Sequence, residues 1–139
     1  MSTFALDASV TLAWLFEDES TAFTVSVLDR LATSTAVVPA IWAFEVANVA
    51  ILSERRRRIS AAQRTGFLEL LGCLPIAIEP VATDRVWSAV IDLAQAQGLT
   101  AYDAAYLEVA ARTGLALATS DGDLAAAATR VGVTLLRGQ

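Results

Sequence analysis

The chain has 139 residues, a formal net charge of −5 and a hydrophobic content of 55%, which suit a single domain over residues 1–139 built around one core. It contains neither His nor Lys, and this excludes Ser–His and Cys–His nucleophile pairs, imidazole metal ligands, Schiff-base lysines and P-loop lysines. Carboxylates, hydroxyls and arginines remain, so an enzyme of this composition would use acids with shifted pKa values or acids that hold a divalent cation.

Short apolar segments alternate with segments of helical spacing in the first half of the chain. In chain order, the predicted elements are a strand over 3–6, a helix over 9–16, an acidic turn over 17–20, a helix over 21–31, a strand over 36–38, a helix from 40 that ends in the arginines at 55–58, and a helix over 61–71. In the helix that starts at 40, Ile41, Phe44, Val49 and Leu52 are expected on the buried side.

The same alternation continues in the second half. The predicted elements are a strand over 75–78, a helix over 83–98, a helix over 101–112, a strand over 115–119, a helix over 124–130 and a strand over 133–136. The residues expected to begin or end helices are Ser60 with Gln63, Thr83, Thr100, Gly98 and Gly114. Strands that alternate with helices imply an α/β fold, a three-layer α/β/α sandwich with a mostly parallel central sheet.

Four acidic residues are expected at one edge of this sheet. Asp7 and Asp121 directly follow predicted strands, while Glu45 and Asp103 lie near the start of predicted helices. In open parallel sheets, ligands bind outside the carboxyl ends of the strands, where the strand order reverses. Carboxylates gathered there repel one another unless a cation or shared protons neutralise them, so the pattern favours a metal site.

Each of these acids also has a structural alternative. Asp7 is suited to cap the helix that follows it, and Asp103 to stabilise the positive end of its helix dipole. Glu45 is harder to explain in this way, because its neighbours are apolar and an ionised glutamate among them is costly unless it is paired or ligates a cation. Asn48, one helical turn further on, is expected to face the same way as Glu45 and to assist it.

Asp121 and Asp123 compete for the same role. Asp121 follows the strand directly, whereas Asp123 is better placed to cap the final helix, so we assign metal ligation to Asp121 and capping to Asp123. Thr119 and Ser120 precede them and can supply hydroxyl groups at the same edge.

The arginine run and the tryptophans have more than one interpretation. Residues 55–58 can form a phosphate track, a solvated helix end or a partner-facing patch. Trp14, Trp42 and Trp87 can stack on bases, but aromatic residues at helical spacing more often belong to a core or an interface, which we expect for all three. Surface buried between subunits or under a partner would explain the high apolar content.

The sequence favours a cytoplasmic protein. No apolar stretch reaches the roughly 18 residues of a membrane span, and the N-terminal residues lack a basic region and reach Asp7 too early for a secretory signal. Cys73 is the single cysteine, which is consistent with a reducing compartment, and we expect it to fill the core.

The segments around the four acids together resemble the PIN domain, and within it the VapC-type toxins. The matching segments are Phe4–Ser9, Glu45–Val49, Ala101–Leu107 and Thr119–Asp121, which span nearly the whole chain. The resemblance implies a PIN-like RNA endonuclease that uses Mg²⁺, for which Mn²⁺ can substitute, and that acts through Asp7, Glu45, Asp103 and Asp121. The metal would be held by Asp7, Asp103 and Asp121, with Thr119 or Ser120 assisting. The resemblance also implies a homodimer and a VapB-like antitoxin.

Other classes of protein agree less well with these residues. A haloacid-type phosphatase or a phospho-receiver domain needs further acids or a lysine, but Ser9 stands two positions after Asp7 and Lys is absent. A PIN-like RNA-processing nuclease outside toxin systems and a catalytically silent PIN-like binding subunit remain alternatives. The pI of about 4.6 is unusual for an RNA-binding protein, because phosphate contacts usually come from Lys and Arg. Bound cations would neutralise part of the negative charge.

Overall fold

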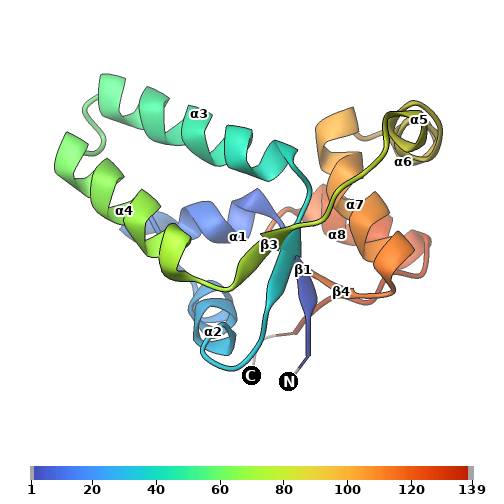
Figure 1. Ribbon diagram of the computed structural model, residues 1–139, viewed down its shortest axis with the longest axis horizontal. Coiled ribbons are helices and arrows are strands. Elements are labelled where there is room, and N and C mark those ends of the chain that lie inside the picture. Colours follow the sequence, from blue (N-terminus) through green and yellow to red (C-terminus); the bar gives the residue numbers. More distant parts are fainter. Residues whose placement is uncertain (1, 138–139) are drawn as a thin grey trace.

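Four parallel strands form the centre of the structure, a computed structural model that describes residues 2–137 (Figure 1). The strands are β1 (Phe4–Leu6), β2 (Ala36–Val38), β3 (Ile76–Ile78) and β4 (Ala116–Ala118). β1 pairs with β2 on one side and with β4 on the other, and β3 pairs with β2, which gives the order β3-β2-β1-β4. The predicted parallel sheet is therefore confirmed.

The order of the strands reverses between β1 and β4. From β1 the chain adds β2 and β3 on one side, then returns to the other side to add β4. The carboxyl ends of β1 and β4 therefore form the topological switch point, where open parallel sheets bind ligands. Asp7 follows β1, and Thr119, Ser120 and Asp121 follow β4.

Helices cover both faces of the sheet. They are α1 (Ala8–Ala13), α2 (Ala22–Arg30), α3 (Ile41–Arg55), α4 (Ala61–Cys73), α5 (Thr83–Arg85), α6 (Ile91–Gln97), α7 (Ala101–Thr113) and α8 (Gly122–Arg130), with a 3-10 turn η1 (Glu17–Glu19) and a π-helical segment η2 (Val86–Val90). Figure 1 shows α3 and α4 as a pair that extends away from the sheet on one side, while α5 and α6 lie on the other side.

Alternation along β1 divides its side chains between two cores. Phe4 and Leu6 pack with residues of α1 and α2, whereas Ala5 packs with residues of α7 and α8 on the opposite face. This is the period of two that a strand imposes. A third cluster, which contains Val46 and Phe67, joins α3 to α4. The three-layer α/β/α arrangement is thus confirmed.

Local capping explains several helix boundaries. Ser60 and Gln63 form the predicted reciprocal capping box at the start of α4, and the Thr100 hydroxyl caps α7. Gly98 and Gly114 end α6 and α7 with φ of 65° and 68°, the left-handed conformation that glycine adopts at least cost. Thr83 is different: Ala82 occupies the N-cap position of α5, so the capping role predicted for Thr83 is wrong.

Two predicted elements are less regular in the structure. The helix expected over 83–98 is divided into α5, η2 and α6 by the π-helical segment. The strand expected over 133–136 is reduced to an isolated bridge between Leu117 and Leu135. The bridge is closed by hydrogen bonds from Leu117 N to Thr134 O and from Leu136 N to Leu117 O, each of 2.8 Å.

Two predictions of burial are wrong. The buried residues of α3 are Val46, Ala50 and Ser53, and Phe44, expected inside, is 73% exposed. α3 contacts α1 and α4 rather than a broad sheet face, and these neighbours cover a different side of the helix from the one that hydropathy indicates. Cys73, expected in the core, is exposed at the end of α4. Within residues 2–137, no helix combines the length and the apolar character that crossing a membrane requires.

Candidate active site

Asp7 is buried at the carboxyl end of β1, with 5% of its surface exposed. It occupies the N-cap position of α1, but its side chain makes no capping hydrogen bond, so the capping alternative for Asp7 is wrong. Its Oδ2 accepts hydrogen bonds from the hydroxyls of Ser9, at 2.6 Å, and Thr119, at 2.7 Å. Because both bonds go to Oδ2, the other carboxylate oxygen remains available to a ligand.

Backbone groups after β4 hold these two hydroxyls in place. The amide of Ser120 donates to the Ser9 hydroxyl, and the amide of Asp121 donates to the Thr119 hydroxyl, each at 3.0 Å. The two strand ends at the switch point are therefore joined through the side chain of Asp7. Sequence reasoning missed Ser9 as a member of the site, although a hydroxyl two residues after an acid is a common local hydrogen-bond partner.

Asp121, not Asp123, caps α8. The Oδ1 atom of Asp121 accepts hydrogen bonds from the amides of Asp123, at 2.9 Å, and Leu124, at 3.3 Å. The assignment of the cap to Asp123 is wrong because α8 begins at Gly122, so the residue before Gly122 is the one that reaches the free amides. Capping uses one oxygen of Asp121, which leaves its second oxygen free for another ligand.

Glu45 and Asp103 approach the site from α3 and α7. Glu45 is half-buried, and its Oε1 accepts a hydrogen bond from the hydroxyl of Tyr106, which is fully buried. Tyr106 lies one helical turn after Asp103, so both residues share a face of α7. That spacing was the available signal for Tyr106, which sequence reasoning did not select. Asn48 lies one turn after Glu45 and is exposed.

Burial and mutual repulsion perturb the acids of this site. Burial raises the pKa of Asp7 above its ordinary value, and the charges of Asp103 and Asp121 raise it further, against the hydrogen bonds from the two hydroxyls. Burial also raises the pKa of Glu45, as do the charges of Asp7 and Asp103, while the Tyr106 hydrogen bond opposes the rise. The pKa of Asp103 is raised by burial and by Asp121. The four acids therefore share one electrostatic neighbourhood.

The donor chemistry of this neighbourhood suits a hard divalent cation. Oxygen ligands are those that Mg²⁺ prefers, and Mg²⁺ is usually held by one or two carboxylates, with water and substrate phosphates completing its coordination. No group of three or more Asp, Glu or Cys side chains between residues 2 and 137 is arranged to hold a metal by itself. Carboxylate oxygens such as those of Asp7 and Asp121 are of the kind that binds this cation, with water and substrate phosphates supplying the ligands that the protein does not.

One member of the arginine run has a structural role. Arg58 forms ion pairs with Asp18 and Glu19, each at 2.9 Å, and its guanidinium lies 3.6 Å from the centre of the Phe16 ring. It therefore ties the end of α3 to η1. The other arginines of the run, at 55–57, are exposed at the end of α3 remote from Glu45, about 15 Å along a helix that rises about 1.5 Å per residue.

The tryptophans divide into two kinds. The indole of Trp14 donates to the carbonyl of Thr24 at 2.8 Å, and that of Trp42 donates to the Thr11 hydroxyl at 3.0 Å. Both rings pack against the cores, as predicted. Trp87 is 71% exposed and is not a core residue.

Comparison with known proteins agrees with this fold. The family model described as the PIN domain matches residues 4–129. Comparison with curated proteins gave no match. Among solved structures, PAE2754 from Pyrobaculum aerophilum is similar with a TM-score of 0.67 and 24% identity, over 91% of this chain and 79% of that one.

Two further solved structures are also similar. VapBC2 from Rickettsia felis, bound to a promoter DNA fragment, matches with a TM-score of 0.67 and 12% identity. FitAcB from Neisseria gonorrhoeae matches with a TM-score of 0.64 and 19% identity, and both matches cover 97% of each chain. At these identities the likeness concerns the fold alone. The family assignment rests on the model that matches residues 4–129, and by that match the chain belongs to the PIN domain family.

Proposed function

We propose that this protein is a metal-dependent RNA endonuclease and the toxin of a VapBC-type toxin–antitoxin pair. The observation that carries the proposal is the buried Asp7, fixed by two hydroxyls at the switch point and surrounded by the charges of Asp103 and Asp121. A fold gains nothing in stability by gathering like charges, so such an arrangement favours a function that uses them. Membership of the PIN domain family supports the nuclease reading.

In the proposed hydrolysis, different residues bind the cation, orient its ligands and accept a proton. Asp7, Asp103 and Asp121 would hold the cation together with water and substrate phosphate, and Ser9 and Thr119 would orient Asp7 as outer-shell hydrogen-bond partners do in metal sites. When a divalent cation is bound, the chemistry it supplies is activation of water and neutralisation of charge on the phosphate. Glu45, oriented by Tyr106 and with a raised pKa, would accept the proton of the attacking water through its second oxygen. The P–O bond to the leaving strand would break as the new bond forms, and the leaving oxygen would take a proton from solvent water.

The partner of this site would be a VapB-like antitoxin. VapBC2 from Rickettsia felis and FitAcB from Neisseria gonorrhoeae share this fold, which supports a partner of this kind. Arginine is the side chain best suited to an acidic pocket, because its guanidinium forks onto carboxylates in two parallel hydrogen bonds. We propose that the antitoxin inhibits by placing an arginine among Asp7, Glu45 and Asp103, and that the toxin is a homodimer. A complex in which this region stays open to solvent would contradict this mode of inhibition.

Incubation of the purified protein with single-stranded RNA tests the proposal. We expect cleavage with Mg²⁺ or Mn²⁺ and none with a chelator or with Asp7→Asn, because the amide cannot replace the charge that holds the cation. Asp123→Asn is the matched control, since Asp123 is an exposed acid of the same segment and does not cap the helix. RNA that stays intact under all conditions, or cleavage that persists in the chelator, would overturn the metal-dependent nuclease assignment.

A further inference from the structure

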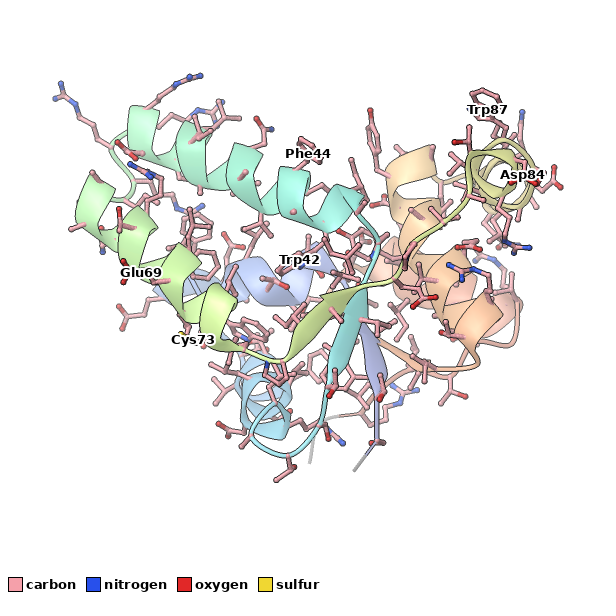
Figure 2. The ribbon with its side chains drawn as sticks, viewed as in Figure 1. Trp42, Phe44, Glu69, Cys73, Asp84 and Trp87 are labelled. Atoms are coloured by element: carbon pink, nitrogen blue, oxygen red, sulfur yellow. The ribbon has the colours of Figure 1, made fainter. Side chains whose placement is uncertain are left out.

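Trp42, at the start of α3, contacts all three hydrophobic clusters of the described chain. Its half-buried side chain packs against the cluster of Ala5, against that of Phe4 and Leu6, and against that of Val46. Figure 2 shows Trp42 near the centre of the molecule, where α3 lies beside α1. Because packed interiors leave little free volume, a side chain shared by three clusters fixes how α3 lies against α1 and the sheet.

A relay of two hydrogen bonds connects Trp42 to the backbone of Asp7. The indole N–H of Trp42 donates to the hydroxyl of Thr11 at 3.0 Å, and this hydroxyl donates to the carbonyl oxygen of Asp7 at 3.3 Å. Thr11 is 0% exposed, so bulk water does not compete for either bond. A hydroxyl can accept one hydrogen bond and donate another at the same time. The Thr11 hydroxyl therefore joins α3 to the end of β1.

Each end of the relay lies one helical turn from an acid of the candidate site. Thr11 follows Asp7 by four positions, and Trp42 precedes Glu45 by three positions on α3. These spacings place residues on the same face of a helix. The hydroxyl of Tyr106 orients the carboxylate of Glu45 from α7, while the relay fixes the helix that carries Glu45.

A link of this kind opposes the repulsion between Asp7 and Glu45. The charge of Asp7 raises the pKa of Glu45, so the two carboxylates repel each other when both are ionised. Repulsion favours a larger separation of α3 from β1. α3 contacts α1 and α4, so α1, which contains Thr11, is the element through which its place relative to β1 is set.

We infer that Trp42 and Thr11 are positioning residues that set the place of Glu45 relative to Asp7 during hydrolysis. The inference rests on the proposed nuclease function and extends it by assigning residues that do not touch the substrate. A proton acceptor must lie within about 2.6–3.2 Å of the water that it deprotonates, and a displacement of about 1 Å can lower a rate about 100-fold. A small shift of α3 would therefore slow the chemical step in a protein that is still folded.

Trp42→Phe and Trp14→Phe form a matched pair of variants. Each replaces a half-buried indole that donates one hydrogen bond, to the Thr11 hydroxyl at 3.0 Å for Trp42 and to the Thr24 carbonyl at 2.8 Å for Trp14. Both substitutions should therefore lower the Tm by similar amounts. We expect Trp42→Phe to lower kcat for RNA cleavage about tenfold at a nearly unchanged KM, because a misplaced proton acceptor affects the transition state and not substrate binding. Trp14→Phe should leave kcat nearly unchanged.

A double-mutant cycle with Thr11→Val shows whether the two side chains act as a unit. Thr11→Val removes the hydroxyl and should also lower kcat about tenfold. The double variant Thr11→Val/Trp42→Phe should lose no more than the larger of the two single losses, because both substitutions interrupt the same relay. Independent effects would multiply to a loss of about 100-fold. The gain in Tm with Mn²⁺ should stay at the wild-type value, since Ser9 and Thr119 hold the carboxylate of Asp7.

The outcomes separate this inference from the proposed function. Equal kcat values in the two phenylalanine variants, or losses that multiply in the double variant, would overturn the inference and leave the nuclease intact. A smaller gain in Tm with Mn²⁺ in Trp42→Phe would also overturn it, because the relay would then act through the cation and not through Glu45. A wild-type protein that cleaves no RNA would remove the proposed function, and the inference with it.

Discussion

Asp7 and Asp121 both follow a strand and precede a helix, yet only Asp121 caps its helix. The carboxylate of Asp7 is engaged by the hydroxyls of Ser9 and Thr119, and hydrogen bonds of this charge-assisted kind are stronger than neutral ones. Thr119 is 112 positions away from Asp7 in the chain. Local sequence rules therefore predict the same role for both acids, and only the pairing of β1 with β4 separates them.

Asp7→Asn and Asp103→Asn should each abolish cleavage and leave the fold intact. Asparagine has the shape of aspartate but lacks the charge that binds the cation. Cleavage rates of labelled RNA together with circular dichroism spectra check both parts of the expectation. Activity near that of the wild type in either variant would remove these residues from the site.

Thr119→Val should reduce the cleavage rate about 10–100-fold, the usual loss when an outer-shell partner of a metal ligand is removed. The substitution keeps the shape of the side chain but deprives Asp7 of a hydrogen bond and the Asp121 amide of its acceptor. Titration of Mn²⁺ against the rate should show that weaker metal affinity accounts for part of the loss. An unchanged rate and metal affinity would mean that Ser9 alone fixes Asp7.

Two substitutions at Asp121 separate capping from charge. Asp121→Asn should lower activity without loss of stability, because asparagine caps helices about as well as aspartate, whereas Asp121→Ala should be about 1 kcal/mol less stable than Asp121→Asn, since both variants lack the charge and only alanine lacks the cap. Asp123→Asn should have little effect on either property. Denaturant unfolding and RNA cleavage measure the two effects. Equal stability of the asparagine and alanine variants at position 121 would contradict the capping role.

At the level of single elements, hydropathy predicts the positions of helices better than it predicts which side of each helix is buried. The helix over 101–112 was expected from Thr100 and Gly114 alone, and α7 ends within one residue of that prediction. The orientation of α3 depends on contacts with α1 and α4, which no local pattern encodes, so hydropathy predicts Phe44 on the buried side although it is exposed. The π-helical turn in 86–90 likewise has no signal in residue spacing.

Two glycines, one at the end of a helix and one inside a helix, test how backbone conformation affects stability. Gly114→Ala should destabilise the protein by about 1–2 kcal/mol, because its φ of 68° is costly for a residue with a Cβ. Gly66→Ala, inside α4 and with open space around it, should stabilise by about 0.5–1 kcal/mol. Denaturant midpoints give both values. The same sign for the two substitutions would contradict the conformational explanation.

At the level of the whole molecule, the sequence was sufficient to predict the order of elements and the edge of the sheet at which Asp7 and Asp121 lie. Strands that alternate with helices imply parallel pairing, and parallel pairing brings the residues that follow β1 and β4 to one edge. The sequence could not predict the contacts made across that edge, such as Tyr106 with Glu45, because they join residues of α3 and α7. Nor could it predict that the segment over 133–136 pairs through a single bridge.

The metal-free protein should lose stability as the pH rises from about 4 toward neutrality. The pKa values of Asp7, Glu45 and Asp103 are raised in the folded state. At a pH above the pKa values of these groups in the unfolded chain, the folded state therefore binds more protons than the unfolded state. The stability that these protons give is complete below the unfolded pKa values and is lost as the pH rises through the folded ones. In chelator, wild type and Asp7→Asn should have similar unfolding free energies at low pH. Near neutrality the unfolding free energy of Asp7→Asn should be the larger. A difference independent of pH would contradict the coupling.

Thermal unfolding with and without Mn²⁺ shows whether the carboxylates after β1 and β4 and on the adjoining helices form a cation site. A cation that binds only the folded state stabilises it by RT ln(1 + [L]/Kd), so about 1 mM Mn²⁺ at a site with a Kd of about 10 μM adds roughly 2.7 kcal/mol. We expect a higher Tm for the wild type and for Asp123→Asn, and a much smaller gain for Asp7→Asn and Asp103→Asn. At about 10 mM Mn²⁺ the same relation gives a larger gain in unfolding free energy. A wild-type Tm that is unchanged by Mn²⁺ up to that concentration would contradict the cation site.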